Sequence, residues 1–338
     1  MGLIYGGNYL SSYTEKFKKA EELYNNDSFE EAAELFKELW KEESDDEAAL
    51  MFANSLKCLD RYDDAEQIYN YLIGIDPTRE APLYNLAGIY YNREEYEKAM
   101  ELYQKAAEAD AECGDAYFKL GECCRMLDTD NTEKAMQYYQ KAVMAKEGTI
   151  YADDAHFFLG IAYLRLDKTL PAFEHLKKSN ELSPGKADTL YFLGLCCEMQ
   201  NKLTKAIEYY KKALSAEDRI DTHINLALCY NDTGDTEKAI AHARTALELD
   251  PYNADALFYY CYILTKNKKG NEAYELLKST QINFDNDERL LDIFIFLALN
   301  RADFDVSDKA YEKLKLISPD CEAVRDYNNE KNRRSSEQ

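Results

Sequence analysis

A small residue recurs along the chain at an almost constant spacing, and this repeat limits the fold more than any other feature. Successive members are separated by 33 to 37 residues. They are Ala32, Ala65, Ala99, Ala135, Ala172, Ala206, Ala239, Ala273 and Ser307. A steady period of this length is typical of stacked repeats, in which each unit contacts only its neighbours. It replaces the expectation from length alone that 338 residues form two or three globular domains.

Other positions keep a fixed distance from this small residue. Twelve residues before it, most units carry a second small residue, such as Ala87 or Gly194. Four residues after it, most carry a large one, such as Tyr69 or Tyr103. The pattern predicts two antiparallel helices per unit, with small residues where helices cross and large ones at the seams between units. Polar segments such as NREE at 92–95 are expected to turn between the paired helices.

The segment LYNLAGIYYNREEYEKAMELYQKAAEAD at 83–110 resembles the tetratricopeptide repeat. The matching positions are Leu83, Leu86, Ala87, Tyr90, Ala99, Tyr103 and Ala106. There the family carries its bulky, small and aromatic residues. The resemblance implies an all-α fold, a right-handed superhelical solenoid of about nine helix-turn-helix units over residues 13–321.

The units are expected to start near residues 13, 46, 80, 114, 153, 187, 220, 254 and 288. An N-terminal arm at 1–12 and a polar C-terminal tail at 322–338 would flank them. Extra residues in LDTDNTEK at 127–134 and in KEGTIYADD at 146–154 are expected to bulge at turns without breaking the stack.

Acidic residues outnumber basic ones, which gives a formal net charge of −23 and a pI near 4.7. Binding to nucleic acid needs clustered Lys and Arg, so the charge argues against such a partner and favours a basic one. No apolar run reaches the length of about 18 residues that a membrane-spanning helix needs. The first residues do not resemble a secretory signal. We therefore expect a cytoplasmic protein without membrane insertion.

Motifs for catalysis are missing from the sequence. It has no phosphate-binding loop, nucleophile elbow or HExxH motif. The four histidines, His156, His175, His223 and His242, lack metal-ligand spacing and are expected in the core or at seams. The nine cysteines include no CxxC pair and are expected to be small core residues in a reducing compartment. We predict no enzyme, no cofactor and no metal.

In the family that the chain resembles, the first helix of each unit lines an inner, concave face. The resemblance therefore assigns partner binding to slots on the first helices. These candidate residues are Asn54, Tyr84, Asn85, Phe118, Lys119, Phe157, Phe158, Tyr191, Phe192, Leu195, Asn225, Phe258, Tyr259, Tyr262 and Phe296. The slots are mixed and partly polar before about residue 125 and strongly apolar after it. Such a lining suits an apolar peptide or an amphipathic helix, although half-buried packing between helices would give the same pattern.

Two other surface patterns suggest different ligands. Some family members capture a C-terminal carboxylate, and the corresponding residues here are Leu50, Asn54, Asn85, Asp115 and Lys119. Asp115 would repel a carboxylate, which argues against this function. A row of aspartates begins five first helices, at Asp115, Asp154, Asp188, Asp221 and Asp255. Asp at these places suits helix capping and the helix dipole, and an acidic ledge for a basic partner is the alternative.

The leading hypothesis is a non-enzymatic interaction scaffold or adaptor. Its concave face would bind a peptide or helix of a partner protein. We expect this bound segment to be apolar and also to have basic character. The alternatives are a self-assembling structural subunit and a regulatory receptor for a signalling peptide. Relatives of the receptor type usually carry a DNA-binding helix-turn-helix, for which the first 12 residues leave no room.

Overall fold

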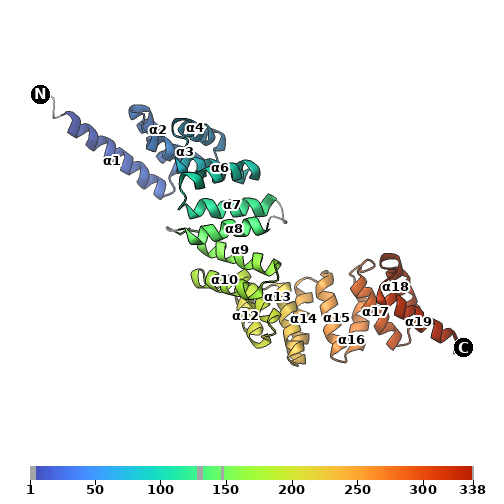
Figure 1. Ribbon diagram of the computed structural model, residues 1–338. Coiled ribbons are helices and arrows are strands. Elements are labelled where there is room, and N and C mark those ends of the chain that lie inside the picture. The colour runs from blue at the N-terminus through green and yellow to red at the C-terminus, as the bar shows by residue number, and fades with distance from the viewer. Residues whose placement is uncertain (1–4, 128–131, 146–147, 337–338) are drawn as a thin grey trace. The chain divides into compact units, whose positions relative to one another are not determined.

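The computed structural model describes residues 5–127, 132–145 and 148–336. Within these ranges all regular elements are α-helices, nineteen in number (Figure 1). The prediction of an all-α stack of helix pairs is confirmed. No helix in the described ranges is both long and apolar enough to cross a membrane. The chain forms two compact bodies, Met1–Lys168 and Thr169–Gln338, which we describe separately.

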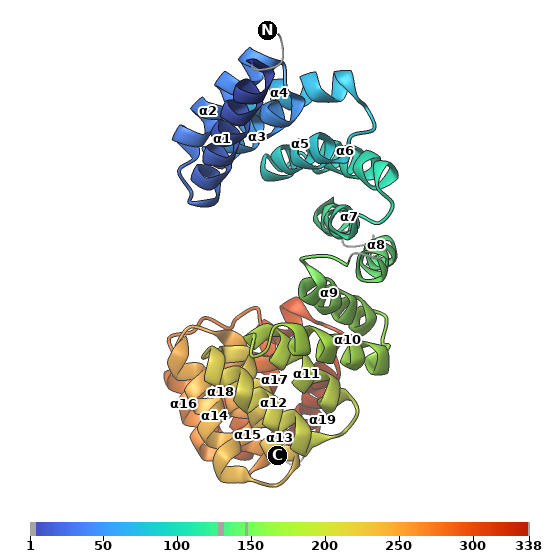
Figure 2. The same cartoon turned by 90° about the vertical axis from the view of Figure 1, so that its left-hand side faces the viewer.

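In the first body, successive helices from α1 to α9 pack against one another. Figure 2 shows this order from α1 through α9. α1 begins at Tyr5, inside the segment that the sequence predicts as an arm. The helices are α1 (Tyr5–Asn25), α2 (Phe29–Glu43), α3 (Asp46–Cys58), α4 (Tyr62–Ile75), α5 (Glu80–Asn92), α6 (Tyr96–Ala109), α7 (Gly114–Leu127), α8 (Thr132–Met144) and α9 (Ala152–Arg165).

The second body continues the same order of packing, and the first helices α13, α15 and α17 also contact one another in sequence. Its helices are α10 (Thr169–Leu182), α11 (Ala187–Met199), α12 (Leu203–Ala216), α13 (Ile220–Asp232), α14 (Thr236–Leu249), α15 (Ala254–Lys266), α16 (Gly270–Ser279), α17 (Glu288–Asn300), α18 (Phe304–Ile317) and α19 (Glu322–Ser336).

The two helices of a pair are joined by one recurring turn. Two residues after the first helix, the backbone enters the left-handed region, for example at Glu94 (φ 61°) and Gly234 (φ 83°). The next residue donates its N–H to a carbonyl five residues back, as Asp235 does to Tyr230 at 2.9 Å. This is the Schellman ending of an α-helix, which satisfies carbonyls at the helix terminus. The polar segment NREE therefore lies between paired helices, as the sequence predicts, and NDTGD at 231–235 occupies the same place between α13 and α14.

The periodic small and large residues face each other inside the pairs α7–α8 and α11–α12. Tyr139 is 2% exposed and Tyr210 is fully buried. A Cβ atom at Gly121 would lie 2.5 Å from the Tyr139 ring, and one at Gly194 would lie 2.6 Å from the Tyr210 ring. The small residue of the first helix thus makes room for the ring of its own partner helix. This close packing adds to the seam contacts that the sequence predicts.

α19 covers the last helix pair. It spans most of the segment that the sequence treats as a polar tail, yet Val324 and Tyr327 are buried against α17 and α18. The Tyr327 ring stacks on Tyr311 with centroids 4.5 Å apart, and its hydroxyl donates to Asp308 at 2.6 Å. The two predicted insertions lie partly outside the described residues, at 128–131 and 146–147.

Candidate interaction surface

Two predicted slots of the first body meet in a polar cluster between α3, α4 and α5. The amide of Asn85 donates to Oδ1 of Asn54 at 3.1 Å, and the Tyr69 hydroxyl donates to the same oxygen at 2.7 Å. Lys57 donates to Oδ1 of Asn85 at 2.5 Å, and burial lowers the pKa of this lysine. The side chains of Asn54 and Asn85 are therefore hydrogen-bonded to each other at the seam between two repeats.

The other residues at the positions where some family members bind a C-terminal carboxylate, Leu50, Asp115 and Lys119, make contacts within the fold. Oδ1 of Asp115 accepts hydrogen bonds from the Thr149 hydroxyl at 2.6 Å and from the Ile150 backbone N–H at 3.0 Å. The Lys119 ammonium lies 4.6 Å from the ring centre of Tyr151. Leu50 is buried. Asp115 thus forms hydrogen bonds to Thr149 and Ile150, which precede α9. Its negative charge is unfavourable for a carboxylate ligand.

The aromatic slots of the first body contribute to packing. Phe118 is only 4% exposed, and the neighbouring candidates are half buried. Each has an aromatic partner: Tyr84 with Tyr103, Phe118 with Tyr151, Phe158 with Tyr139, and Phe157 with Phe158, at centroid distances of 5.3, 4.6, 5.5 and 5.4 Å. Ring pairs of this kind stabilise the seams where they are found.

Glu122, at a first-helix slot of the first body, is a buried carboxylate. It accepts two hydrogen bonds from Arg125, at 3.1 and 2.9 Å, and one from the Tyr139 hydroxyl at 2.6 Å. The Arg125 guanidinium lies 4.9 Å from the ring centre of Phe158. Its bonds to Glu122 raise the pKa of Arg125. The i, i+3 spacing of Glu and Arg was a signal for this pair.

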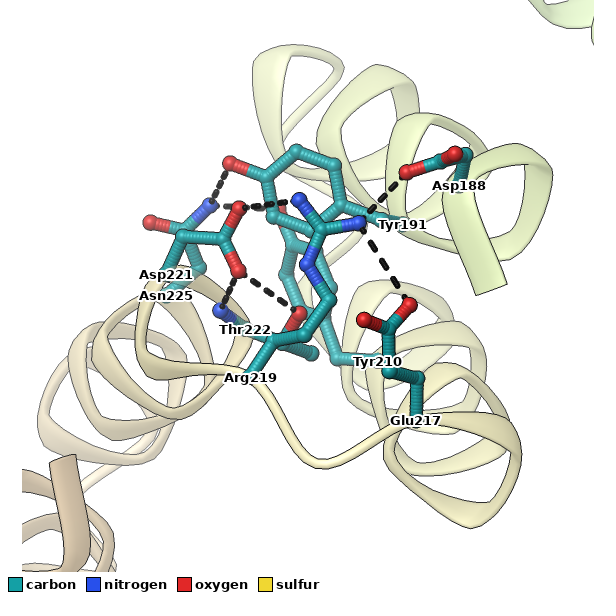
Figure 3. A network of polar contacts seen from close by, with 8 residues as sticks. All are labelled: Asp188, Tyr191, Tyr210, Glu217, Arg219, Asp221, Thr222 and Asn225. Atoms are coloured by element: carbon teal, nitrogen blue, oxygen red, sulfur yellow. Dashed lines mark hydrogen bonds and ion pairs between the residues drawn. The ribbon is translucent and has the colours of Figure 1, made fainter. Parts of the chain in front are cut away.

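In the second body, Arg219 joins two successive repeats (Figure 3). Its guanidinium pairs with Asp188, at the start of α11, and with Asp221 at 3.1 Å, at the start of α13. It also lies 5.9 Å from the ring centre of Tyr191. Asn225 donates to the Tyr191 hydroxyl at 3.0 Å. The predicted slots Tyr191 and Asn225 therefore belong to this inter-repeat network.

The same link occurs elsewhere in the chain. Arg79 pairs with Glu47 within the first body, and Arg289 pairs with Asp255 at 2.8 Å within the second. In each case an arginine near the start of one first helix reaches the acidic residue of the preceding one, 31 to 34 residues earlier. Arg289 also lies 4.9 Å from the ring centre of Phe258, another predicted slot.

These links explain much of the aspartate row. Asp188, Asp221 and Asp255 lie in the first turns of their helices and pair with arginines. The cap position before Asp255 is held by Asn253, whose side chain accepts from the Ala256 N–H. The row therefore supports the structural interpretation through ion pairs and the helix dipole, while Asn253 provides the cap of α15.

One set of slots in the second body remains apolar and partly exposed. We call Leu195, Leu228, Tyr262 and Phe296 the apolar row; they lie on α11, α13, α15 and α17, one per first helix. The first three are half buried, and Phe296 is 52% exposed. The neighbouring candidates Phe192 and Tyr259 are half buried as well. At the same slot, the first body carries Asn54, Gly88, Glu122 and Ile161.

Cysteine and histidine side chains lie mostly in the interior. Cys123, Cys124, Cys196, Cys197, Cys229 and Cys261 are buried, and none of the nine cysteines is in a disulfide. Burial raises the pKa of Cys123 and Cys261 to about 12, which makes them poor nucleophiles at neutral pH. His223 and His242 meet between α13 and α14. Among the described side chains, no group of three His, Cys, Asp or Glu could hold a metal ion.

Sequence profiles of the tetratricopeptide repeat (TPR) match residues 59–122, 114–149, 187–217 and 230–293, together more than half of the chain. The chain belongs to the TPR family. Among solved structures, this TPR chain is similar to the C-terminal part of a TPR repeat-containing protein from Cytophaga hutchinsonii. That match has 23% identity and a TM-score of 0.55, and covers 72% of this chain and 98% of the other.

Two further proteins are similar to this TPR chain. PilF of Pseudomonas aeruginosa is 16% identical with a TM-score of 0.52, over 65% of this chain and 97% of the other. These structural matches show the fold alone. The RNA polymerase-associated protein CTR9 of Caenorhabditis elegans is 24% identical over 246 residues, 60% of this chain. The match spans about a fifth (21%) of the CTR9 sequence.

Proposed function

We propose that this TPR protein is a non-enzymatic interaction scaffold whose apolar row binds an apolar segment of a partner protein. TPR proteins generally mediate contacts between proteins. The observation that carries the proposal is the partial exposure of the apolar row, which ends in Phe296 at 52% exposure. Partly exposed apolar side chains that recur along one face are a common feature of protein-binding surfaces.

The spacing of the row suits an extended or helical partner. Each first helix contributes one large apolar side chain, so the row presents a series of contacts along the second body. An amphipathic helix can meet such a series with apolar side chains at i, i+3, i+4 and i+7. The corresponding slots of the first body carry Asn54, Gly88, Glu122 and Ile161, which do not form such a series of large apolar side chains. We therefore place partner binding in the second body.

The surroundings of the row favour a partner with positive charge. The net charge of −23 attracts basic segments and accelerates their association. We also place the interaction in the cytoplasm, because nine cysteines without a disulfide suit a reducing compartment. We give less weight to self-assembly through an end repeat, since α19 covers the last helix pair.

Site-specific photo-cross-linking tests this proposal. A photoreactive phenylalanine at Tyr262 or Phe296 should cross-link to a defined partner segment in lysate. The same residue at Leu316, which is 84% exposed on α18, serves as the control for exposure. Tyr262→Glu with Phe296→Glu should abolish capture of that partner, whereas Leu316→Glu should not. Equal cross-linking at all three positions, or capture that survives the double substitution, would remove the apolar row as the binding site.

A further inference from the structure

The apolar row ends beside a pocket between α17 and α19. This end pocket has a volume of about 670 Å³, which is within the range of binding pockets for small ligands and side chains. Ile295 and Tyr327 form its buried part. Phe296 and Phe304 form its exposed part, with exposed fractions of 52% and 42%. An apolar side chain could therefore enter and contact aromatic rings.

Carboxylates line the same pocket. Asp292 comes from α17 and Asp326 from α19. The pKa of Asp292 is raised by partial desolvation and by the charges of Glu288, Asp326 and Glu322. Among the described side chains, no Lys or Arg forms an ion pair with Asp292 or Asp326. This part of the surface therefore holds negative charge at some cost to stability.

The acidic and apolar parts have a fixed spacing. Asp292 and Phe296 are four residues apart on α17, so they lie about one helical turn apart, roughly 6 Å along the axis. Glu288 precedes Asp292 by another turn. A helical ligand with a cation and an apolar side chain four residues apart could meet both groups at once.

We propose that the end pocket binds a basic, apolar segment of a partner protein. A Lys or Arg of that segment pairs with Asp292 and Asp326, while an adjacent apolar side chain packs on Phe296 and Phe304. A partner is favoured over a second copy of this chain, because two copies would each carry a net charge of −23 and repel one another. This inference rests on the proposed function and specifies the chemistry of its ligand.

Two synthetic peptides test the inference with the full chain. Both are 16-residue amphipathic helices with identical Leu positions (about four turns); one has Lys four residues from Leu, and the other has Gln there. Fluorescence anisotropy measures their affinities. The Lys peptide should bind more tightly than the Gln peptide. Asp292→Asn with Asp326→Asn should weaken the Lys peptide by about fivefold, as expected for two partly exposed ion pairs, and should leave the Gln peptide unchanged.

A matched variant separates local from overall charge. Glu208→Gln with Glu237→Gln removes two exposed carboxylates elsewhere in the second body and gives the same net charge. It should leave the affinity for the Lys peptide within error of the natural chain. Equal weakening in both double variants, or equal affinity for the Lys and Gln peptides, would overturn the proposal. Helicity and melting temperature verify that the variants are folded.

Two further outcomes distinguish the alternatives. A concentration-dependent mass in sedimentation that is lost in Asp292→Asn with Asp326→Asn would assign the pocket to a second copy and overturn the partner proposal. If a partner cross-links at Tyr262 and the Lys peptide binds Asp292→Asn with Asp326→Asn as tightly as the natural chain, only the proposal of a basic ligand for the end pocket is wrong. The interaction scaffold itself would then stand.

Discussion

The Nδ1 atoms of His223 on α13 and His242 on α14 lie 2.9 Å apart. Nε2 of His223 also lies 2.8 Å from Oδ1 of Asp218. Because two ring nitrogens at this distance share one hydrogen, at least one imidazole is neutral and accepts it. Burial lowers the pKa of His242, and the charges of His223, Lys211 and Lys238 lower it further.

This relationship predicts a loss of stability in mild acid. The unfolded chain protonates His242 near its ordinary pKa of about 6.5, but the folded chain resists protonation until lower pH. The free energy of unfolding should therefore fall as pH drops through that value and stop falling below the folded pKa. Urea denaturation at pH 7.5 and 5.5 should show a smaller difference for His242→Gln than for the natural chain. His175→Gln measures separately the contribution of another half-buried histidine whose pKa is lowered by burial. A pH dependence unchanged by His242→Gln would contradict the prediction.

Gly121 and Gly88 should respond in opposite ways to alanine. At Gly121 a Cβ atom would meet three atoms of the Tyr139 ring at 2.5 to 2.9 Å, whereas at Gly88 the nearest atom is 3.6 Å away. Overpacking costs about 1–3 kcal/mol, and alanine in a helix gains up to about 1 kcal/mol over glycine. Gly121→Ala should therefore lower the melting temperature, and Gly88→Ala should keep or raise it. Calorimetry on both variants decides the matter, and a stabilised Gly121→Ala would show that the ring can move.

Tyr327 should be needed for the stability of the last repeat. Its side chain is 1% exposed, stacks on Tyr311 and donates to Asp308. Tyr327→Ala should cost about 3 kcal/mol or more in the C-terminal helices, as for other buried aromatic residues. Hydrogen exchange should show faster opening of α17 and α18, with α11 and α12 little changed. Protection of α17 and α18 equal to that of the natural chain would show that α19 contributes little.

Arg219 should stabilise the second body through its ion pairs with three carboxylates, those of Asp188, Asp221 and, at 4.0 Å, Glu217. Arg219→Met removes these pairs and should cost about 1 kcal/mol. The cost should shrink in 1 M NaCl, because salt screens partly exposed ion pairs. Lys212→Met is the control, since Lys212 lies over the Tyr209 ring and forms no ion pair among the described residues. A cost that is independent of salt would attribute the effect to lost packing on Tyr191.

The repeat and its turns could be predicted because each unit obeys the same local rules. The turn at Glu94 lies in NREE, the polar segment expected between paired helices, whereas the packing of Tyr139 on Gly121 inside one pair was not predicted. The links between repeats were harder to predict, since Arg219 and Asp188 are 31 residues apart and carry no motif. Exposure of the slots could not be predicted either. Phe118 is buried beneath Tyr151, which follows an irregular loop, whereas Phe296 borders an open pocket.

The position of α19 separates the end of the repeat motif from the end of the folded core. The repeats are predicted to end near residue 321, yet Val324 and Tyr327 complete the hydrophobic cluster around Leu291, Tyr311 and Leu314. A fragment truncated near residue 321 would therefore expose to solvent a hydrophobic cluster that α19 covers in this chain. Residues beyond the predicted repeats are therefore part of the core that stabilises the last repeat.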